Sequence, residues 1–279
     1  MPELIYYING NWVPLKSAKI PITDAGFQLG DGLFETLRFD NKKIFSAQKH
    51  LERLNKGLKF VHIDLNINNE NIISLMNQLI NKNNLSSGLL RLMVTRGNLE
   101  GEPWTFKGTP NLYISIRNLT KEPTLPVKVV FFAENKYPII RFNPAIKSLN
   151  YIGNMLAKKD AEKLSAYEPV FYNNSGYITE CAIRNIFFIR GNALITPQIK
   201  LGVLEGVMRN SIINIAQKLN LDVFEEKIKF KSINNMDEAF ISSTGIGLYP
   251  CYWEGWKSNF TITKNIKNIL DAIISKTSS

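Results

Sequence analysis

A polar, proline-bearing stretch in residues 118–126 (NLTKEPTLP) divides the chain into two parts that each carry their own strands and helices. Such a composition is typical of a linker between domains. In the first part, apolar runs predict strands and periodic segments predict helices. The expected strands are 4–8, 33–39, 89–96 and 111–117, and the expected helices are 47–60 and 69–82.

The second part repeats this mixture after the linker. Its expected strands are 127–133, 170–173, 186–190, 193–196, 223–228 and 239–243, and its expected helices are 151–164, 207–219 and 263–276. Two strand-rich parts with few helices favour an α+β fold with a barrel-like second part. We therefore expect a small N-terminal α/β domain (1–120), a linker (121–126) and a larger domain (127–279).

Composition narrows the functional class. Hydrophobic residues make up 44% of the chain and charged residues 21%, as in ordinary globular proteins. Cys181 and Cys251 are too few for a disulfide framework, the N-terminus has no secretory leader, and no run is long enough to span a bilayer. A cytoplasmic protein without membrane partners is expected. The net charge of +10 comes from scattered lysines and arginines and no nucleic-acid motif is visible, so nucleic-acid binding is not expected. Two histidines without cysteine pairs argue against a metal site.

Lys147 is the first candidate catalytic residue. It lies between the apolar run 127–133 and a helical pattern that includes Tyr151, Ile152, Met155 and Leu156. A desolvated lysine amine is a nucleophile toward aldehydes and forms a Schiff base with carbonyl substrates or with pyridoxal phosphate (PLP). The alternative is a solvated surface lysine, the commonest environment for this residue type.

Further features carry related chemistry, each with a plainer alternative. Glu180 precedes a very apolar strand, so its carboxylate is expected at the mouth of the core. The alternative is a surface glutamate beside a turn. The segment 206–209 (GVMR) opens a helix whose free amides suit a phosphate, although a helix that starts after a glycine is common. The hydroxyls of 242–245 (SSTG) also suit a phosphate, although many turns have this composition. His50 and Arg53 share a helix face at i,i+3 spacing, where they are either solvated or, with Arg53 turned inward, in need of an anion.

Together these residues supply what PLP requires. The aldehyde needs a lysine, the pyridine nitrogen needs an acid that keeps it protonated, and the phosphate needs amides, hydroxyls and a guanidinium.

The order and identity of the segments then resemble the class IV PLP-dependent transaminases, a group of branched-chain aminotransferases, D-amino acid aminotransferases and aminodeoxychorismate lyases. The resemblance covers nearly the whole chain. The segments that carry it are YYINGNWVP, DAGFQLGDGLFETLRF, HLERL, VTRG, KSLNYIGNMLA, GYITECAIRNIFFI, LITP, LEGVMRN and DEAFISSTGIGLYPC. It implies fold type IV, with a small N-terminal α/β domain and a larger C-terminal pseudo-barrel domain, and a homodimer in which an N-terminal loop completes the partner's site.

The resemblance also implies roles for single residues. Lys147 would hold PLP and move the proton, and Glu180 would pair with the pyridine nitrogen. The residues that resemble the phosphate contacts are Arg53, Val207, Met208 and Thr244, the middle two through their amides. Met208 replaces a threonine of many relatives, so a hydroxyl contact is lost there. Tyr151 resembles a tyrosine near the cofactor's phenolic oxygen.

The substrate is less well defined. Phe34, Thr36 and Arg38 belong to the FETLR segment, in which Thr36 resembles the lyases. The arginine that some relatives use for the substrate carboxylate is missing from NLEGEPWTF, so Arg38, Arg91 and Arg96 are the candidates, with Arg96 favoured. By alternation Arg91 would face away from Leu90 and Leu92. We expect a transaminase acting on an amino acid and a 2-oxo acid, with 4-amino-4-deoxychorismate lyase as the alternative.

Overall fold

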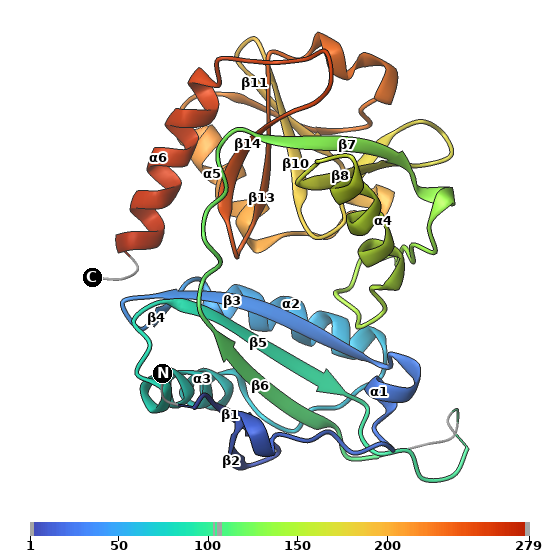
Figure 1. Cartoon of the computed structure of the whole chain (residues 1–279), viewed down its shortest axis with the longest axis vertical. Helices are drawn as coiled ribbons and strands as arrows, with labels where there is room; N and C mark the ends of the chain where they lie inside the picture. Colours follow the sequence, from blue (N-terminus) through green and yellow to red (C-terminus); the bar gives the residue numbers. More distant parts are fainter. Residues whose placement is uncertain (1–2, 103, 105–107, 277–279) are drawn as a thin grey trace. The chain divides into compact units, whose positions relative to one another are not determined.

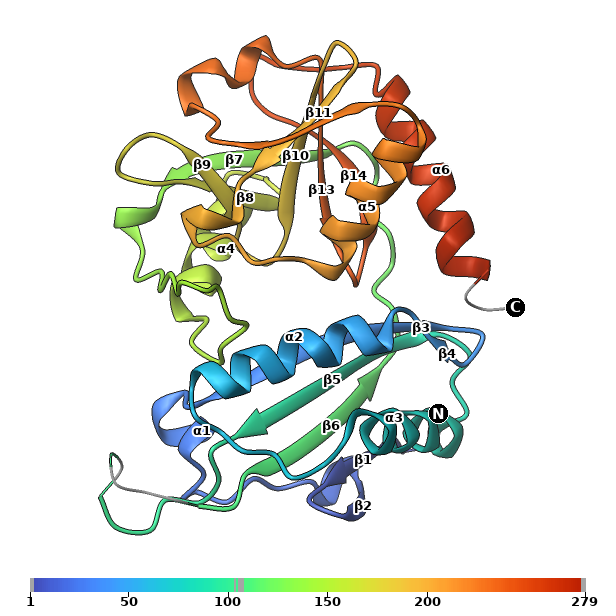
Figure 2. The same ribbon diagram turned by 180° about the vertical axis from the view of Figure 1, so that it is seen from behind.

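The computed structural model describes residues 3–102, 104 and 108–276, and its contacts divide the chain into two compact units. Unit 1 comprises Met1–Thr120, Ile146–Asn150 and Ile274–Ser279, and unit 2 comprises Lys121–Ala145 and Tyr151–Ile273. Figures 1 and 2 show the elements of each from opposite sides. The sequence analysis assigned the short segment Ile146–Asn150 to the second domain together with its neighbours. The predicted domain boundaries stay a prediction.

Unit 1 is an antiparallel six-stranded sheet with helices α2 and α3 packed on one face (Figure 2). The strand order is β2-β1-β6-β5-β3-β4. The strands are β1 (Ile5–Ile8), β2 (Asn11–Pro14), β3 (Gly32–Asp40), β4 (Lys43–Ile44), β5 (Gly88–Thr95) and β6 (Asn111–Arg117). The helices are η1 (Leu15–Ser17), α1 (Ala25–Leu29), α2 (Ala47–Phe60) and α3 (Asn69–Asn83).

Two periodicities build the core of unit 1. Leu51, Leu54 and Leu58 recur at helical spacing on α2 and are buried against the sheet. Along β3, alternate residues beginning with Leu33 and Leu37 face these leucines. The residues between them, which include Phe34 and Thr36, therefore lie on the sheet face opposite the helices.

Unit 2 is built on a mixed eight-stranded sheet in the order β12-β11-β10-β13-β14-β7-β8-β9. The strands are β7 (Val127–Ala133), β8 (Glu168–Tyr172), β9 (Ile178–Cys181), β10 (Asn185–Arg190), β11 (Ala193–Pro197), β12 (Asp222–Glu226), β13 (Glu238–Ser243) and β14 (Gly247–Tyr252). The helices are η2 (Glu134–Lys136), α4 (Ile152–Lys163), η3 (Ile199–Leu201), α5 (Val207–Lys218), η4 (Phe230–Asn235) and α6 (Thr261–Lys276).

The sheet of unit 2 curves back on itself as a half-barrel, because β9 at one end of the strand order also contacts β10 and β11. Its interior is apolar, with β-branched and aromatic side chains such as Val170, Ile186 and Trp253 in one cluster. Helix α4 packs on β7 and β8, and α5 packs on β12 and β13. The mixed α/β architecture with a curved second sheet agrees with the fold class expected from the sequence.

Several elements differ from the sequence prediction. Strands β2, β4, β9 and β14 and helix α1 were missed, because most are short and β14 contains Pro250, which weakens a strand signal. The placement of Lys147 at a strand–helix junction was wrong in one respect. After β7 the chain forms η2 and then runs outside named helices and strands from 137 to 151, so Lys147 lies in an irregular segment. Within the described ranges, no helix is long and apolar enough to cross a bilayer.

Candidate active site

The backbone of Lys147 is held by the edge of β3. The Phe34 amide donates to the Lys147 carbonyl at 2.9 Å, the Leu149 amide donates to the Gly32 carbonyl at 3.0 Å, and Ser148 pairs with Leu33 as an antiparallel bridge. Strand β4 pairs with β3 only at Phe39 and Asp40, which leaves the beginning of β3 open to this short addition. Backbone hydrogen bonds of the kind found between antiparallel strands therefore hold this irregular segment against β3.

Phe34 brings two cationic side chains together. The Lys147 Nζ lies 4.6 Å from the centroid of the Phe34 ring, and the Arg91 guanidinium carbon lies 3.8 Å from the same centroid. Arg91 is exposed while Leu90 and Leu92 are buried, as alternation along β5 predicted. Register places Arg91 directly opposite Thr36 on β3. An amine and a guanidinium thus lie against one aromatic ring, and Thr36 is the register partner of Arg91.

On the helix-covered face of β3, Glu35 forms a buried ion pair that the sequence analysis missed. Arg53 donates to both of its carboxylate oxygens at 2.7 Å, and the Nδ1 of His50 lies 2.8 Å from Oε2. Burial alone would raise the pKa of Glu35, but the charge of Arg53 and the hydrogen bonds from His50 and Arg53 outweigh burial and lower the pKa to about 2.

His50 is fully buried, so the solvated interpretation of the His50–Arg53 pair is wrong. Burial lowers the pKa of His50 below its usual range, although the hydrogen bond with Glu35 opposes this shift. An ionised carboxylate only accepts, so the neutral ring carries its proton on Nδ1. A glutamate at an inward position of an apolar strand, followed by HLERL, was the available sequence signal for this cluster.

The other two candidate arginines have structural partners. Arg96 donates to Asp31 at 2.5 and 3.1 Å and to the carbonyls of Val61 and His62 at 2.8 and 3.0 Å. Arg38 donates to Asp40 at 2.6 Å. The Arg96 contacts join the end of β5 to the loop after α2 and to the residue before β3.

In unit 2, Glu180 lies on β9 and its carboxylate has two fixed donors. One oxygen accepts from Arg141, and the other accepts from the Leu204 amide at 3.1 Å. Arg141 also donates to Glu134. Burial would lower the pKa of Arg141, but the charges of Glu180 and Glu134 raise the pKa above its ordinary value. Neither Arg141 nor Glu134 was singled out from the sequence.

The start of α5 provides free amides in the same unit. Gly206 is the N-cap, and no side chain caps this helix end. A Cβ at this position would meet the Asn185 Oδ1 at 2.2 Å, which explains the glycine, while the Asn185 Nδ2 donates to the Leu204 carbonyl at 3.0 Å. The amides of Val207 and Met208 therefore stand at the positive end of the helix dipole.

Two further predicted residues are placed by unit 2. Thr244 opens the turn between β13 and β14, one residue beyond Ser243. Ser242 of the same segment lies within β13, as the expected strand 239–243 implies, and is fully buried with a hydroxyl that has no hydrogen-bond partner. Tyr151 is the N-cap residue of α4.

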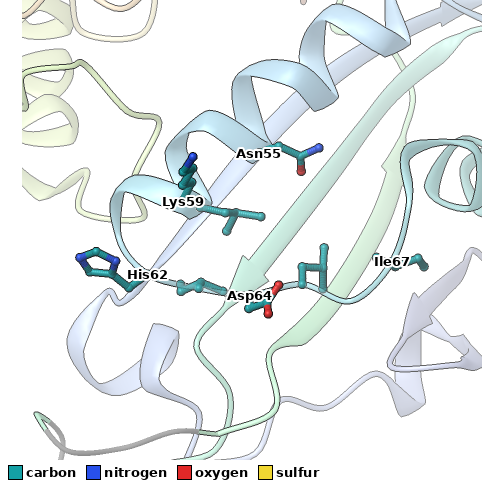
Figure 3. A pocket seen from close by; sticks show the side chains of 8 residues that line it. Asn55, Lys59, His62, Asp64 and Ile67 are labelled. Atoms are coloured by element: carbon teal, nitrogen blue, oxygen red, sulfur yellow. The ribbon is translucent and has the colours of Figure 1, made fainter.

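A surface hollow of about 460 Å³ lies between the end of α2 and the segment that leads to α3. Figure 3 shows the side chains that line it. Its lining residues are Asn55, Leu58, Lys59, His62, Ile63, Asp64, Leu65 and Ile67. It contains none of the predicted site residues. In the part of the chain that the structure describes, no group of three or more His, Cys, Asp or Glu side chains gathers as metal ligands would.

Comparison with known families shows what the chain is similar to. The model of the family described as amino-transferase class IV matches residues 32–252. A Methanocaldococcus jannaschii protein assigned as a branched-chain-amino-acid aminotransferase is 30% identical over 88% of this chain and 86% of its own length. The D-alanine aminotransferase of Staphylococcus aureus is 31% identical over 88% of this chain and 86% of its own length.

Solved structures share the fold. A branched-chain aminotransferase of Thermoproteus uzoniensis, crystallised with norvaline, has a TM-score of 0.89 at 22% identity and covers 99% of this chain and 96% of its own. The branched-chain aminotransferase of Thermobaculum terrenum in its PLP form has a TM-score of 0.85 at 21% identity (99% and 95%). A Legionella pneumophila protein assigned as a 4-amino-4-deoxychorismate lyase has a TM-score of 0.85 at 24% identity (93% and 97%).

Proposed function

Because this chain belongs to the class IV aminotransferase family, we propose that it is a PLP-dependent transaminase that moves an amino group between an amino acid and a 2-oxo acid, with Lys147 as the catalytic residue. The observation that carries the proposal is that the Lys147 amine and the Arg91 guanidinium both lie over the ring of Phe34. The aldehyde of PLP requires a nucleophilic amine, and the carboxylate of an amino acid substrate requires a cation.

The residues present fit PLP, which supplies an electron sink for carbanion chemistry when bound. The uncapped start of α5 offers the amides of Val207 and Met208 to the phosphate. The Thr244 hydroxyl and the Arg53 guanidinium, which pairs with Glu35, stay proposed phosphate contacts. Glu180 offers a fixed carboxylate to the ring nitrogen. Tyr151 stays a proposed contact. In support, the Thermobaculum terrenum neighbour was crystallised in its PLP form.

Lys147 performs two tasks in this proposal. Its Nζ would hold the cofactor through the aldehyde carbon, and once a substrate amine had displaced it, the free Nζ would carry a proton to and from the substrate Cα. The hydrogen bonds of its backbone to β3 keep the Lys147 segment in place while the side chain exchanges partners.

Arg91 replaces Arg96 as our proposed carboxylate contact. The charge of Arg96 is already matched by Asp31 and its donors point to two carbonyls, whereas Arg91 lies over the face of Phe34 opposite Thr36. A guanidinium binds a carboxylate bidentately. Phe34 and Thr36 then line the substrate side, and Arg38, paired with Asp40, is a more distant candidate.

Thr36 favours one alternative, 4-amino-4-deoxychorismate lyase, which shares the fold and cofactor. Thr36 is the register partner of Arg91, and in the lyase its hydroxyl would assist proton transfer during pyruvate elimination. One assay separates the two activities. Release of pyruvate from aminodeoxychorismate without an amino acceptor indicates the lyase, and conversion of the cofactor to its amine form by amino acids indicates the transaminase. We expect the second result, since the relatives from Methanocaldococcus jannaschii and Staphylococcus aureus, 30% and 31% identical, are both named as aminotransferases.

We further propose a homodimer. Ile22, Phe27 and Leu29 are 75%, 67% and 53% exposed on a segment that Asp24 holds in place. The buried Asp24 carboxylate accepts from the Phe27 amide and from the side chains of Thr95, Asn111 and Tyr113 at 2.6–3.0 Å. Apolar side chains on a rigid, exposed segment suit an interface. Sedimentation of the wild type and of Phe27→Asp should give a dimer and a monomer respectively, and a monomeric wild type would contradict the proposal.

A cytoplasmic location is part of the same proposal. Cys181 and Cys251 are both free and buried, as suits a protein of a reducing compartment.

A further inference from the structure

Arg141 joins two carboxylates in unit 2 that come from different elements. Its Nη1 donates to the Oε1 of Glu180 on β9, while Nε and Nη2 donate to the Oε1 of Glu134 in η2 at 3.0 and 2.5 Å. Thr179 lies between these groups, since its hydroxyl accepts from Arg141 at 3.2 Å and donates to Glu134. The side chains of Glu134 and Glu180 are each 14% exposed and that of Arg141 is 20% exposed, so the cluster is largely shielded from water.

The charges of this cluster do not cancel. One guanidinium faces two carboxylates, which leaves one net negative charge among Glu134, Arg141 and Glu180. An arginine paired with Glu180 alone would neutralise the carboxylate that the cofactor's ring nitrogen needs. With Glu134 present, Arg141 can fix the Glu180 side chain without removing the excess negative charge.

We propose that Glu134 and Arg141 are positioning residues for cofactor recognition: Arg141 fixes Glu180, and Glu134 supplies the second negative charge that lets Glu180 attract a protonated ring nitrogen. The inference rests on the proposed role of Glu180 and adds two residues that act through it. It explains why a segment outside any helix or strand carries an arginine that is largely shielded from water. It also explains why the hydroxyl of Thr179 is turned toward Glu134.

The test compares two ligands of the protein freed of cofactor: PLP, and its 1-deaza analogue, in which a CH group replaces the ring nitrogen. Their dissociation constants are measured by quenching of tryptophan fluorescence, and the ratio of the two reports the contact at the ring nitrogen alone. The wild type should bind PLP more tightly than the analogue. In Glu134→Gln this preference should fall by about tenfold, because one nearby charge is removed while the hydrogen bonds from Arg141 and Thr179 can still form.

Two further variants sharpen the result. Glu134→Asp keeps the charge and should retain the preference within about threefold. Glu254→Gln removes a carboxylate of the same unit that is 93% exposed, and should leave the preference unchanged. Thermal unfolding of each variant shows whether it is folded.

The inference is overturned if Glu134→Gln keeps the wild-type preference, if it weakens both ligands by the same factor, or if Glu134→Asp behaves like Glu134→Gln. A wild type with no preference would instead overturn the proposed role of Glu180, and this inference with it.

Discussion

Two arginines, one inside β5 and one directly after it, offer a sharp test of the site. Arg91 lies within β5 and Arg96 directly follows it, yet their surroundings differ. Arg91 has the Phe34 ring beside it, and Arg96 has a carboxylate and two carbonyls. We expect Arg91→Gln to impair substrate recognition with little effect on stability, and Arg96→Gln to do the opposite.

The magnitudes follow from these contacts. A hydrogen-bonded interaction with a charged group contributes about 1.5–3 kcal/mol, so loss of the Arg91–carboxylate contact should lower kcat/KM for amino acids by roughly 10- to 150-fold. The lost contact with Phe34 costs about 0.5–1 kcal/mol. In Arg96→Gln, loss of the bidentate pair with Asp31 and of two carbonyl contacts should cost about 2 kcal/mol, or roughly 4–8 °C in Tm.

The assay follows conversion of the bound cofactor to its amine form, once with amino acids and once with primary amines of the same skeleton that lack the carboxylate. Arg91→Gln should lose activity toward amino acids while its activity toward the amines stays within about threefold of the wild type, since no carboxylate contact is at stake. An equal loss with both substrate classes would refute the carboxylate role of Arg91. A selective loss in Arg96→Gln would return that role to Arg96.

Three other substitutions test the remaining parts of the site. Lys147→Ala should abolish turnover and prevent borohydride from fixing the cofactor covalently, while dialysis shows that the phosphate contacts still retain PLP; wild-type turnover would exclude Lys147. Glu180→Gln should lower turnover by orders of magnitude with PLP still bound, because the amide carries no charge; unchanged kcat would make Glu180 a structural residue. The pKa of Glu35 is lowered to about 2, so its ionised form contributes stability that is present above the unfolded-state value near 4.5 and is lost as pH falls toward 2, up to about 3 kcal/mol. Glu35→Gln should therefore flatten the acid side of a urea-unfolding profile between these pH values, and a wild-type profile in the variant would contradict the buried pair.

Much of unit 1 followed from local patterns in the sequence. The alternation of β3 and the helical spacing of Leu51, Leu54 and Leu58 each reflect one buried face, so they are visible in any short window. The same reasoning oriented Arg91 correctly. Local patterns do not reveal partners from other elements, however. Asp31 and the carbonyls of the loop after α2 decide the environment of Arg96, and nothing near Arg96 in the sequence indicates them.

The buried carboxylates show the same limit in unit 2. Glu180 is 39 residues from Arg141 along the chain, and Glu134 precedes Arg141 by seven residues without a helical or strand pattern that joins them. Their identity as one cluster depends on how η2, β9 and an irregular segment are brought together by the curved sheet. Short strands such as β9 have weak sequence signals, so the element that carries Glu180 was missed even though Glu180 itself was selected.

The charge balance within each unit separately supports the proposed chemistry. In unit 1, Arg53 pairs with Glu35, the neutral His50 adds no charge, and the side chains of Arg91 and Lys147 both lie against the ring of Phe34. In unit 2 the cluster around Arg141 keeps one net negative charge. A substrate carboxylate requires the first kind of surface and a protonated ring nitrogen requires the second. If the net negative charge of this cluster served only to hold η2 against β9, Glu134→Gln would alter stability but leave the preference for the ring nitrogen intact.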